Sequence, residues 1–141
     1  MIEIVNRQRA RKLDSTQWRD FAETALAAVN QNKKNATVVF VSDLTIKTLN
    51  QSFRGKNYAT DVLSFPSAAE TFEDQTDLGE VVISIQRAMA QAKEHGLSFS
   101  NEVKQLILHG LLHLSGFDHE TDKGDMNRLE LRLRKRLGID A

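Results

Sequence analysis

Three of the four histidines of this chain lie within one segment, residues 109–119. His109 and His113 are four residues apart, so on an α-helix, which turns about 100° per residue, both project from one face and can bind one cation. His119 lies roughly 240° further around the same helix, and it can join the pair only if the chain turns first. Gly116 stands where a helix would end on a left-handed residue, and a turn there would bring His119 back. The spacing therefore predicts a helix, a glycine stop and a three-histidine metal site with an open fourth position, which is typical of catalytic zinc.

The alternative is that these histidines are structural. Two histidines four residues apart in an apolar helix are often a packed core pair, and the third histidine behind a helix-ending glycine is what favours metal binding. His95 differs from them because it ends a helical stretch before Gly96, where a histidine interacts favourably with terminal carbonyl groups and the helix dipole. We expect His95 to be structural.

Composition limits the kinds of site and partner. The chain has 141 residues, which suits a single domain over 1–141, and its formal net charge is zero, so nucleic-acid binding has to come from local patches. It contains no cysteine, so metal ligands must be nitrogen or oxygen atoms. Residues 1–5 do not resemble a secretory signal, and no apolar run approaches the length of a membrane span. We expect a cytoplasmic protein without a membrane partner.

The hydrophobic pattern predicts one α+β domain. Apolar and β-branched runs predict strands over 2–5, 37–41, 62–65 and 80–85. Helical periodicity and capping residues predict helices that open at Asp14 or Ser15, at Asp43, at Gln86, at Ser100 and at Asp122. The order β-α-β-α-β-β-α-α-α predicts a mixed four-stranded sheet packed by about five helices.

The last predicted helix has two unlike faces. Its apolar stripe consists of Met126, Leu129, Leu133 and Leu137. The opposite face is basic, with Arg128, Arg132 and Lys135 flanked by Arg134 and Arg136. Such a face is either solvated or in contact with an RNA backbone, and the sequence leaves both open.

The histidine spacing matches that of the metzincin metalloproteases in every position but one. Those enzymes have a glutamate directly after the first histidine, where this chain has Gly110. That glutamate is the general base of peptide hydrolysis, so its absence disfavours a peptidase. A divalent metal can still lower the pKa of bound water to around 7 and polarise a phosphoryl oxygen, which is what phosphoester cleavage requires.

The segment 49–66 contains cations that suit phosphate chemistry. Arg54 precedes a glycine, where its guanidinium could enter a cleft and bind phosphate through two parallel hydrogen bonds. Lys56 is a second cation, and Tyr58 and Phe65 could stack on bases. The alternatives are a solvated arginine and aromatic rings that only pack.

Two motifs together resemble the YbeY family of bacterial rRNA maturation factors. They are Phe53-Arg54-Gly55-Lys56 with Thr60-Asp61-Val62-Leu63-Ser64-Phe65-Pro66, and His109-Gly110-x-Leu-His113-Leu-x-Gly116-x-Asp118-His119. The resemblance implies a metal-dependent, single-strand-specific endoribonuclease that acts in small-subunit (16S) rRNA 3′-end maturation and ribosome quality control. It also implies zinc on His109, His113 and His119, with Arg54 as the functional arginine. This chain departs from the family at Gly79-Glu80, where Gly-Asp is frequent.

The leading hypothesis is thus an endoribonuclease in which the zinc held by His109, His113 and His119 activates water or the scissile phosphate. Nickel would also suit imidazole ligands. Arg54 would stabilise the charged transition state, and Lys56 and Tyr58 are candidate substrate contacts. The expected partners are single-stranded ribosomal RNA and the small ribosomal subunit or its proteins, with no DNA.

Some alternatives stay open at this point. Asp118 would either orient a ligating histidine or cap backbone groups in the turn. Activated water would leave a phosphate and a hydroxyl end, as we expect, whereas attack by the RNA's own 2′-OH would leave a cyclic phosphate. The rival function is a ribosome-assembly binding factor with a structural metal.

Overall fold

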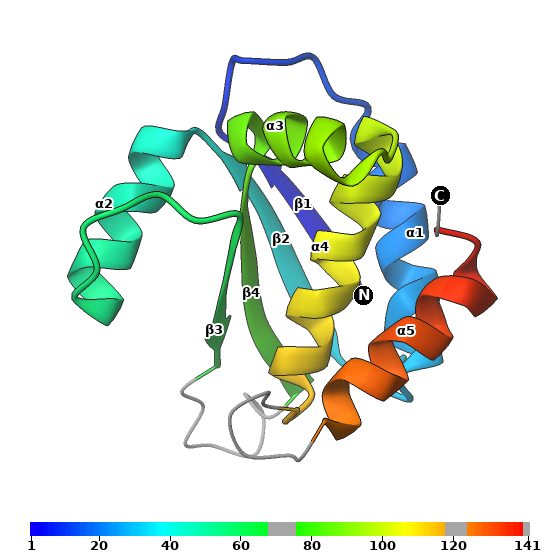
Figure 1. Cartoon of the computed structure of the whole chain (residues 1–141). Helices are drawn as coiled ribbons and strands as arrows, with labels where there is room; N and C mark the ends of the chain where they lie inside the picture. Colours follow the sequence, from blue (N-terminus) through cyan, green and yellow to red (C-terminus); the bar gives the residue numbers. More distant parts are fainter. Residues whose placement is uncertain (68–75, 118–123, 140–141) are drawn as a thin grey trace.

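A computed structural model describes residues 1–67, 76–117 and 124–139. In this part of the chain one mixed sheet (Figure 1) contains β1 (Ile2–Asn6), β2 (Asn35–Val41), β3 (Val62–Pro66) and β4 (Asp77–Ser84). The strand order is β1-β2-β4-β3, in which β1, β2 and β4 run parallel and β3 is antiparallel to β4. The helices are α1 (Ser15–Ala28), α2 (Asp43–Arg54), α3 (Ile85–His95), α4 (Phe99–Leu114) and α5 (Asp125–Leu137). The predicted α+β class and the predicted order of elements are confirmed.

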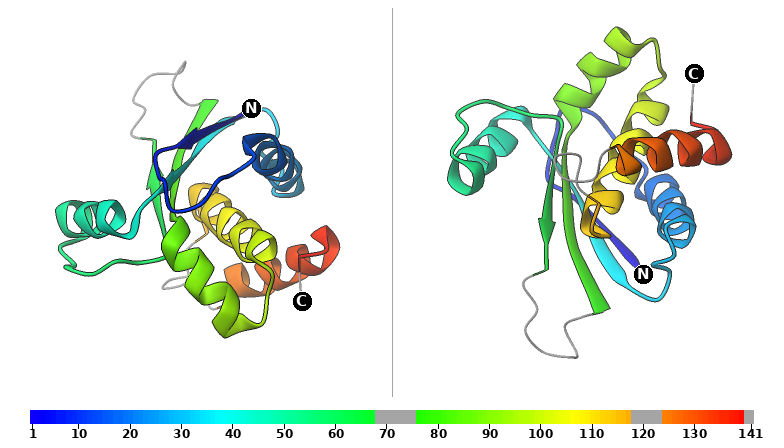
Figure 2. Two further views of the ribbon diagram at one scale, coloured as in Figure 1. Left: turned by 90° about the horizontal axis from the view of Figure 1, so that it is seen from above. Right: turned by 60° about the horizontal axis from the view of Figure 1, so that its bottom comes forward.

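The helices are divided unequally between the two faces of the sheet. α2 packs on one face, while α1 and α4 cover the other, with α3 and α5 packed against α4 (Figures 1 and 2). Side chains alternate along β2, so Val38 and Phe40 join the larger core under α1 and α4, whereas Val39 and Val41 join the smaller one under α2. The two cores hold α2 and α4 on opposite sides of the β3 edge of the sheet.

α4 carries the histidine pair and is the most buried helix. The side chains of Val103, Ile107, Leu108 and Leu111 are fully buried. Gly110 lies directly against β4, because a Cβ atom there would come within 2.4 Å of Val81 Cγ1. A glutamate therefore does not fit where the metzincins place their general base.

The N-cap of helix α2 lies one residue before the predicted cap. Ser42 has the extended backbone of an N-cap, and its side chain accepts from the backbone N–H of Thr45. Asp43 is already helical, and its carboxylate accepts from Ser84 Oγ at 2.6 Å and from Arg87 at 3.2 Å. The predicted cap at Asp43 was wrong, because the preceding serine fits that position.

The starts of the last three helices also differ from the predicted ones. Ser98 caps α4 and accepts from the N–H of Asn101, so the predicted cap, Ser100, lies inside the first turn. Ile85 begins α3, one residue before the predicted start, and does not end β4. α5 begins at Asp125, and Asp122 lies outside the described residues.

Across the described residues, no helix is both long enough and apolar enough to cross a membrane.

Candidate active site

The C-terminal half of α4 brings two of the predicted ligands together. The Nε2 atoms of His109 and His113 are 3.2 Å apart, and their rings meet edge to face with centroids 4.7 Å apart. The cause is local, since residues four apart on a helix are neighbours on its surface. The structure thus places the two imidazoles as the spacing predicted.

This geometry suits a zinc ion. With Zn–N distances of 2.0–2.1 Å and tetrahedral angles, two ligating nitrogens lie about 3.3 Å from each other. The observed separation of 3.2 Å is close to that value without any rearrangement of the helix. Within the ranges 1–67, 76–117 and 124–139 no group of three metal-binding side chains occurs, and the third predicted ligand, His119, lies outside them.

The predicted turn after α4 is present. Gly116 has a φ of 100°, in the region that favours glycine, and its N–H donates to the carbonyl of His113 at 3.1 Å. The N–H of Phe117 then reaches back to the carbonyl of Leu112 at 3.2 Å, which closes the helix end. Asp118, like His119, lies outside the described residues, so its role stays a prediction.

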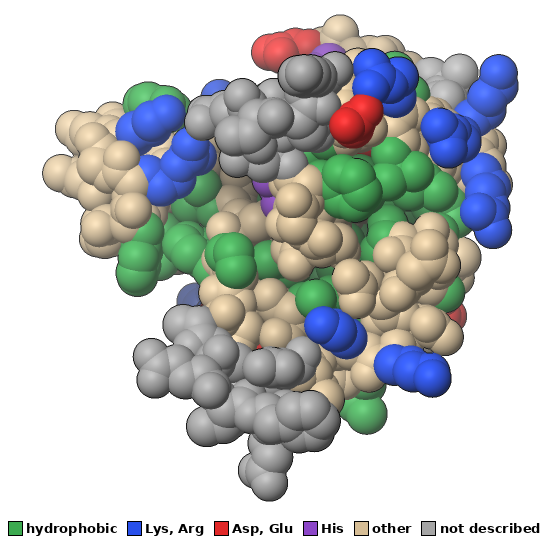
Figure 3. Space-filling model, turned by 90° about the horizontal axis from the view of Figure 1, so that it is seen from below, with side chains coloured by type: hydrophobic (Ala, Val, Ile, Leu, Met, Phe, Trp, Pro, Cys, Tyr) green, Lys and Arg blue, Asp and Glu red, His purple; other side chains and the backbone are tan. Residues whose placement is uncertain are grey.

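A cavity of about 390 Å³ opens beside the histidine pair. Its lining residues come from the end of α2, the segment before β3, β3 itself and α4, namely Arg54, Thr60, Asp61, Val62, Leu63, Ser64, His109 and His113. Figure 3 shows histidine side chains inside a hollow, with Lys and Arg side chains on the neighbouring lobe that α2 forms. The two sequence motifs, about fifty residues apart, thus face one cavity.

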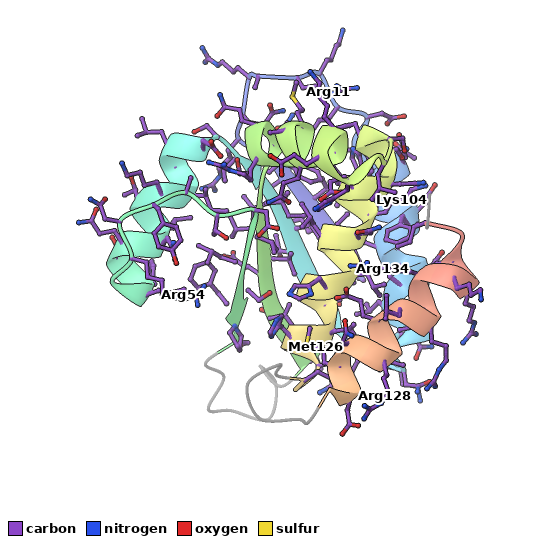
Figure 4. All side chains as sticks on the ribbon, viewed as in Figure 1. Arg11, Arg54, Lys104, Met126, Arg128 and Arg134 are labelled. Carbon is purple, nitrogen blue, oxygen red and sulfur yellow. The ribbon has the colours of Figure 1, made fainter. Side chains whose placement is uncertain are left out.

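Arg54 is the cation among the described residues that line this cavity. It is the last residue of α2 and is solvent-exposed, and Figure 4 shows it at the end of that helix. Among the residues that the structure describes, its guanidinium forms no ion pair or hydrogen bond. Its donors are therefore available for an anionic group in the cavity.

The rest of the lining explains the Thr-Asp-x-x-Ser part of the motif. Asp61 Oδ1 accepts from the N–H of Val62 at 2.8 Å and from Thr60 Oγ1 at 3.3 Å, which shapes the entry to β3. Ser64 Oγ donates to the carbonyl of Gly110 at 3.4 Å and so joins β3 to α4. These groups hold the cavity wall, and sequence reasoning had given them no individual role.

Other predicted site residues lie away from this lining. Lys56 and Tyr58 are exposed and do not line the cavity, and the carbonyl of Tyr58 accepts from Asn50 Nδ2 at 2.9 Å. Phe65 packs edge to face on Phe53 with centroids 5.2 Å apart. Their contact with substrate stays a prediction.

The carboxylate at the family's Gly-Asp position also lies elsewhere. Glu80 alternates with Val81 along β4, so it faces away from α4, and it does not line the histidine cavity.

A residue that the sequence reasoning missed lies directly behind His109. Glu130 of α5 is 4% exposed, and its Oε1 is 2.6 Å from His109 Nδ1. A signal for it was present, because a glutamate stands between Met126 and Leu133 in the apolar stripe of α5. A charged residue at such an inward position needs a buried partner.

His95 has a related contact but a different setting. Its Nδ1 is 2.9 Å from Glu102 Oε2, and half of its side chain is exposed. The expectation that it interacts with the carbonyl groups at the end of α3 is modified, since its Nδ1 contacts a carboxylate of α4.

Comparison with known proteins shows the family of this chain. The profile of the family described as Endoribonuclease YbeY matches residues 3–138. Proteins named Endoribonuclease YbeY are 48% identical in Solibacter usitatus, over 72% of this chain and 65% of that protein, and 34% identical in Geobacter sulfurreducens, over 95% and 91%. The solution structure of TM1509 from Thermotoga maritima superposes with a TM-score of 0.66 at 28% identity, covering 97% of this chain and 89% of that one. The chain belongs to the endoribonuclease YbeY family.

Proposed function

We propose that this protein is a metal-dependent endoribonuclease that cuts single-stranded RNA, and that its cellular substrate is the 3′ end of the small-subunit (16S) rRNA. Membership of the family supports RNA cleavage as the reaction class. The observation that carries the proposal is the cavity in which the histidine pair and the exposed Arg54 meet. The preference for single strands and for ribosomal RNA follows from the family resemblance.

The histidines and Arg54 have separate roles in this proposal. His109 and His113, with His119 as the predicted third ligand, would hold a zinc ion. When bound, zinc would lower the pKa of a coordinated water and polarise a phosphoryl oxygen. Arg54 would bind the scissile phosphate and stabilise the negative charge that grows on its oxygens as the bond breaks.

A cleavage assay with the zinc-loaded chain tests the proposal. Single-stranded RNA should be cut, while an RNA duplex and single-stranded DNA of the same sequence should not. Linear phosphate ends would indicate attack by water, and a 2′,3′-cyclic phosphate would indicate attack by the 2′-OH. No cleavage of any RNA by a protein that carries zinc would contradict the proposal.

The cellular part needs a separate experiment. A strain that lacks the protein should accumulate small-subunit rRNA with an unprocessed 3′ end, and the purified protein should shorten that precursor. We propose that it acts in the cytoplasm in contact with the small subunit or its proteins. A strain with normal 3′ ends would contradict this assignment.

Helix packing argues against the rival, in which a structural metal supports a binding factor. α4 packs on the sheet and on α1 through residues such as Ile107 and Leu111, and we expect this packing to hold the helix in place without a metal. A chelator should therefore abolish cleavage but leave the helical circular dichroism nearly unchanged, unlike the zinc fingers that unfold without metal. Loss of the helical signal on chelation would support the rival.

A further inference from the structure

Glu130 is a buried acid with both carboxylate oxygens engaged. Its Oε1 is 2.6 Å from His109 Nδ1, and its Oε2 accepts from Arg134 Nη2 at 2.5 Å. Only 5% of the Glu130 side chain is exposed. Figure 4 places Arg134 between α4 and α5. The carboxylate therefore links His109 of α4 to Arg134, which lies on the same helix, α5, as Glu130.

The contact determines which nitrogen of His109 carries a proton. An ionised carboxylate can only accept hydrogen bonds, so the Nδ1 atom 2.6 Å from it has to be the donor. A neutral imidazole has a single N–H, which leaves the lone pair on Nε2. That Nε2 atom is the one that lies 3.2 Å from His113 Nε2, on the side of the cavity.

The position of Glu130 is held by the core around it. Met126 and Leu133, one turn before and one turn after, are buried at 0% and 3% exposure on the same face of α5. A carboxylate between them is costly unless it is paired, and the pairing with His109 and Arg134 removes most of that cost. Glu130 thus contacts one imidazole of the candidate site and one guanidinium of its own helix.

We propose that Glu130 is a positioning residue for the metal ligand His109. It holds the imidazole with Nδ1–H toward α5 and the Nε2 lone pair toward the cavity, which prepares His109 to bind a cation. Arg134 donates to the other carboxylate oxygen and so holds its orientation. The proposal rests on the proposed function, because it takes the histidine pair to be a metal site.

Two substitutions at Glu130 separate hydrogen bonding from burial. Glu130→Leu removes the acceptor and should weaken zinc binding by about 10- to 100-fold, the usual effect of losing such a partner of a ligating histidine. Glu130→Gln keeps a carbonyl that can accept from Nδ1–H, so it should recover part of that loss. Zinc affinity is measured by competition with a chromophoric chelator.

A second readout does not depend on metal. In the metal-free protein at about pH 8, where ordinary imidazoles are neutral, the side-chain ¹⁵N shifts of His109 report its tautomer. The unchanged chain should show the Nδ1–H form, and Glu130→Leu should shift His109 toward the Nε2–H form. Thermal unfolding of each variant shows whether it is folded. If Glu130→Leu does not fold, Glu130→Gln is used for both measurements instead.

The chain contains a matched control. Glu102 is also buried and also contacts a histidine Nδ1, that of His95, but it does not line the cavity of the histidine pair. Glu102→Gln should leave zinc affinity and the His109 tautomer unchanged.

The outcomes separate the two proposals. Suppose that the wild-type protein binds zinc and cuts RNA. If the folded Glu130 variants then show the same zinc affinity and the same His109 tautomer as the wild type, the positioning role alone is overturned. An unchanged chain that binds no zinc would overturn the proposed function and with it the role of Glu130 toward a metal. Weakened binding with a shifted tautomer in Glu130→Leu, and neither change in Glu102→Gln, is the result we expect.

Discussion

Two histidines of this chain are held in the same way, and their surroundings separate them. His95 and His109 both contact a buried glutamate through Nδ1, at 2.9 Å and 2.6 Å, and both line a second cavity of about 240 Å³ beside α4. Only His109, of the two, also lines the larger cavity with a second imidazole and Arg54. A histidine and a buried acid are therefore not enough to make a site, and convergence with other functional groups is what distinguishes His109.

The acid of each pair has a different second partner. With its amide turned to donate, Gln91 Nε2 is 3.1 Å from Asp61 Oδ2 and 3.2 Å from Glu102 Oε1, so Glu102 helps join α3 and α4 to the start of β3. Glu130 instead pairs with Arg134 of its own helix and holds the imidazole that faces the cavity. The first pair supports the fold, and the second supports the candidate ligand.

Alanine at the two histidines should give the largest difference. His109→Ala removes a proposed metal ligand and should lower RNA cleavage by about a thousandfold or more, since a bound metal supplies several kcal/mol of transition-state stabilisation. His95→Ala should cut RNA at nearly the unchanged rate. Cleavage rates and zinc content are measured for both variants. Equal losses of cleavage in His95→Ala and His109→Ala would contradict the distinction between the two histidines.

The position of Arg54 predicts the next largest effect. Arg54→Glu should keep zinc and fold but lose on the order of 10²- to 10³-fold in turnover, as expected for loss of a cationic donor to the transition state. Lys47→Glu is the matched control, since Lys47 is an exposed cation of the same helix that does not line the cavity. If the zinc-loaded Arg54→Glu protein turns over RNA at the wild-type rate, Arg54 is a solvated residue without a role in catalysis.

The sequence predicted the parts of the site that depend on local geometry. The helical spacing of His109 and His113 and the positive φ of Gly116 follow from a few neighbouring residues, and the structure has both. Capping was predicted less well because several serines and aspartates compete within two residues of each helix start, as at Ser98 and Ser100. Several helix starts therefore differ from the predicted ones, while the order of the elements is the predicted one.

Contacts between distant segments could not be predicted in the same way. That Arg54 would face the histidine pair depends on α2 and α4 both packing against β3, which the helical pattern alone does not determine. Glu130 was not predicted because its partner His109 lies on another helix, and the apolar pattern of α5 does not show which buried group a charged residue within it would contact. The family resemblance supplied Arg54 but had not singled out Glu130.

Gly110 offers a smaller test of how rigidly the histidine pair is held. Gly110→Ala brings a Cβ atom within 2.4 Å of Val81 Cγ1, in a core where Val81 is fully buried. Overpacking should cost about 1–3 kcal/mol, partly offset by the roughly 1 kcal/mol that alanine gains over glycine inside a helix. Urea unfolding measures the net loss, and a more stable Gly110→Ala protein would show that α4 can shift away from β4.

The basic face of α5 gives the smallest expected effect. Arg134 belongs to the predicted basic face, yet it turns inward to Glu130, and Arg128 pairs with Asp125. Arg132 and Lys135 are exposed, so they are the cations of this face to test against an RNA backbone. If they contact phosphates, the double change Arg132→Gln and Lys135→Gln should flatten the slope of log affinity against log salt by about 0.7 per lost contact, without altering sequence preference. An unchanged slope would mean that this face is solvated, and that RNA binding depends on the cavity where Arg54 and the histidine pair meet.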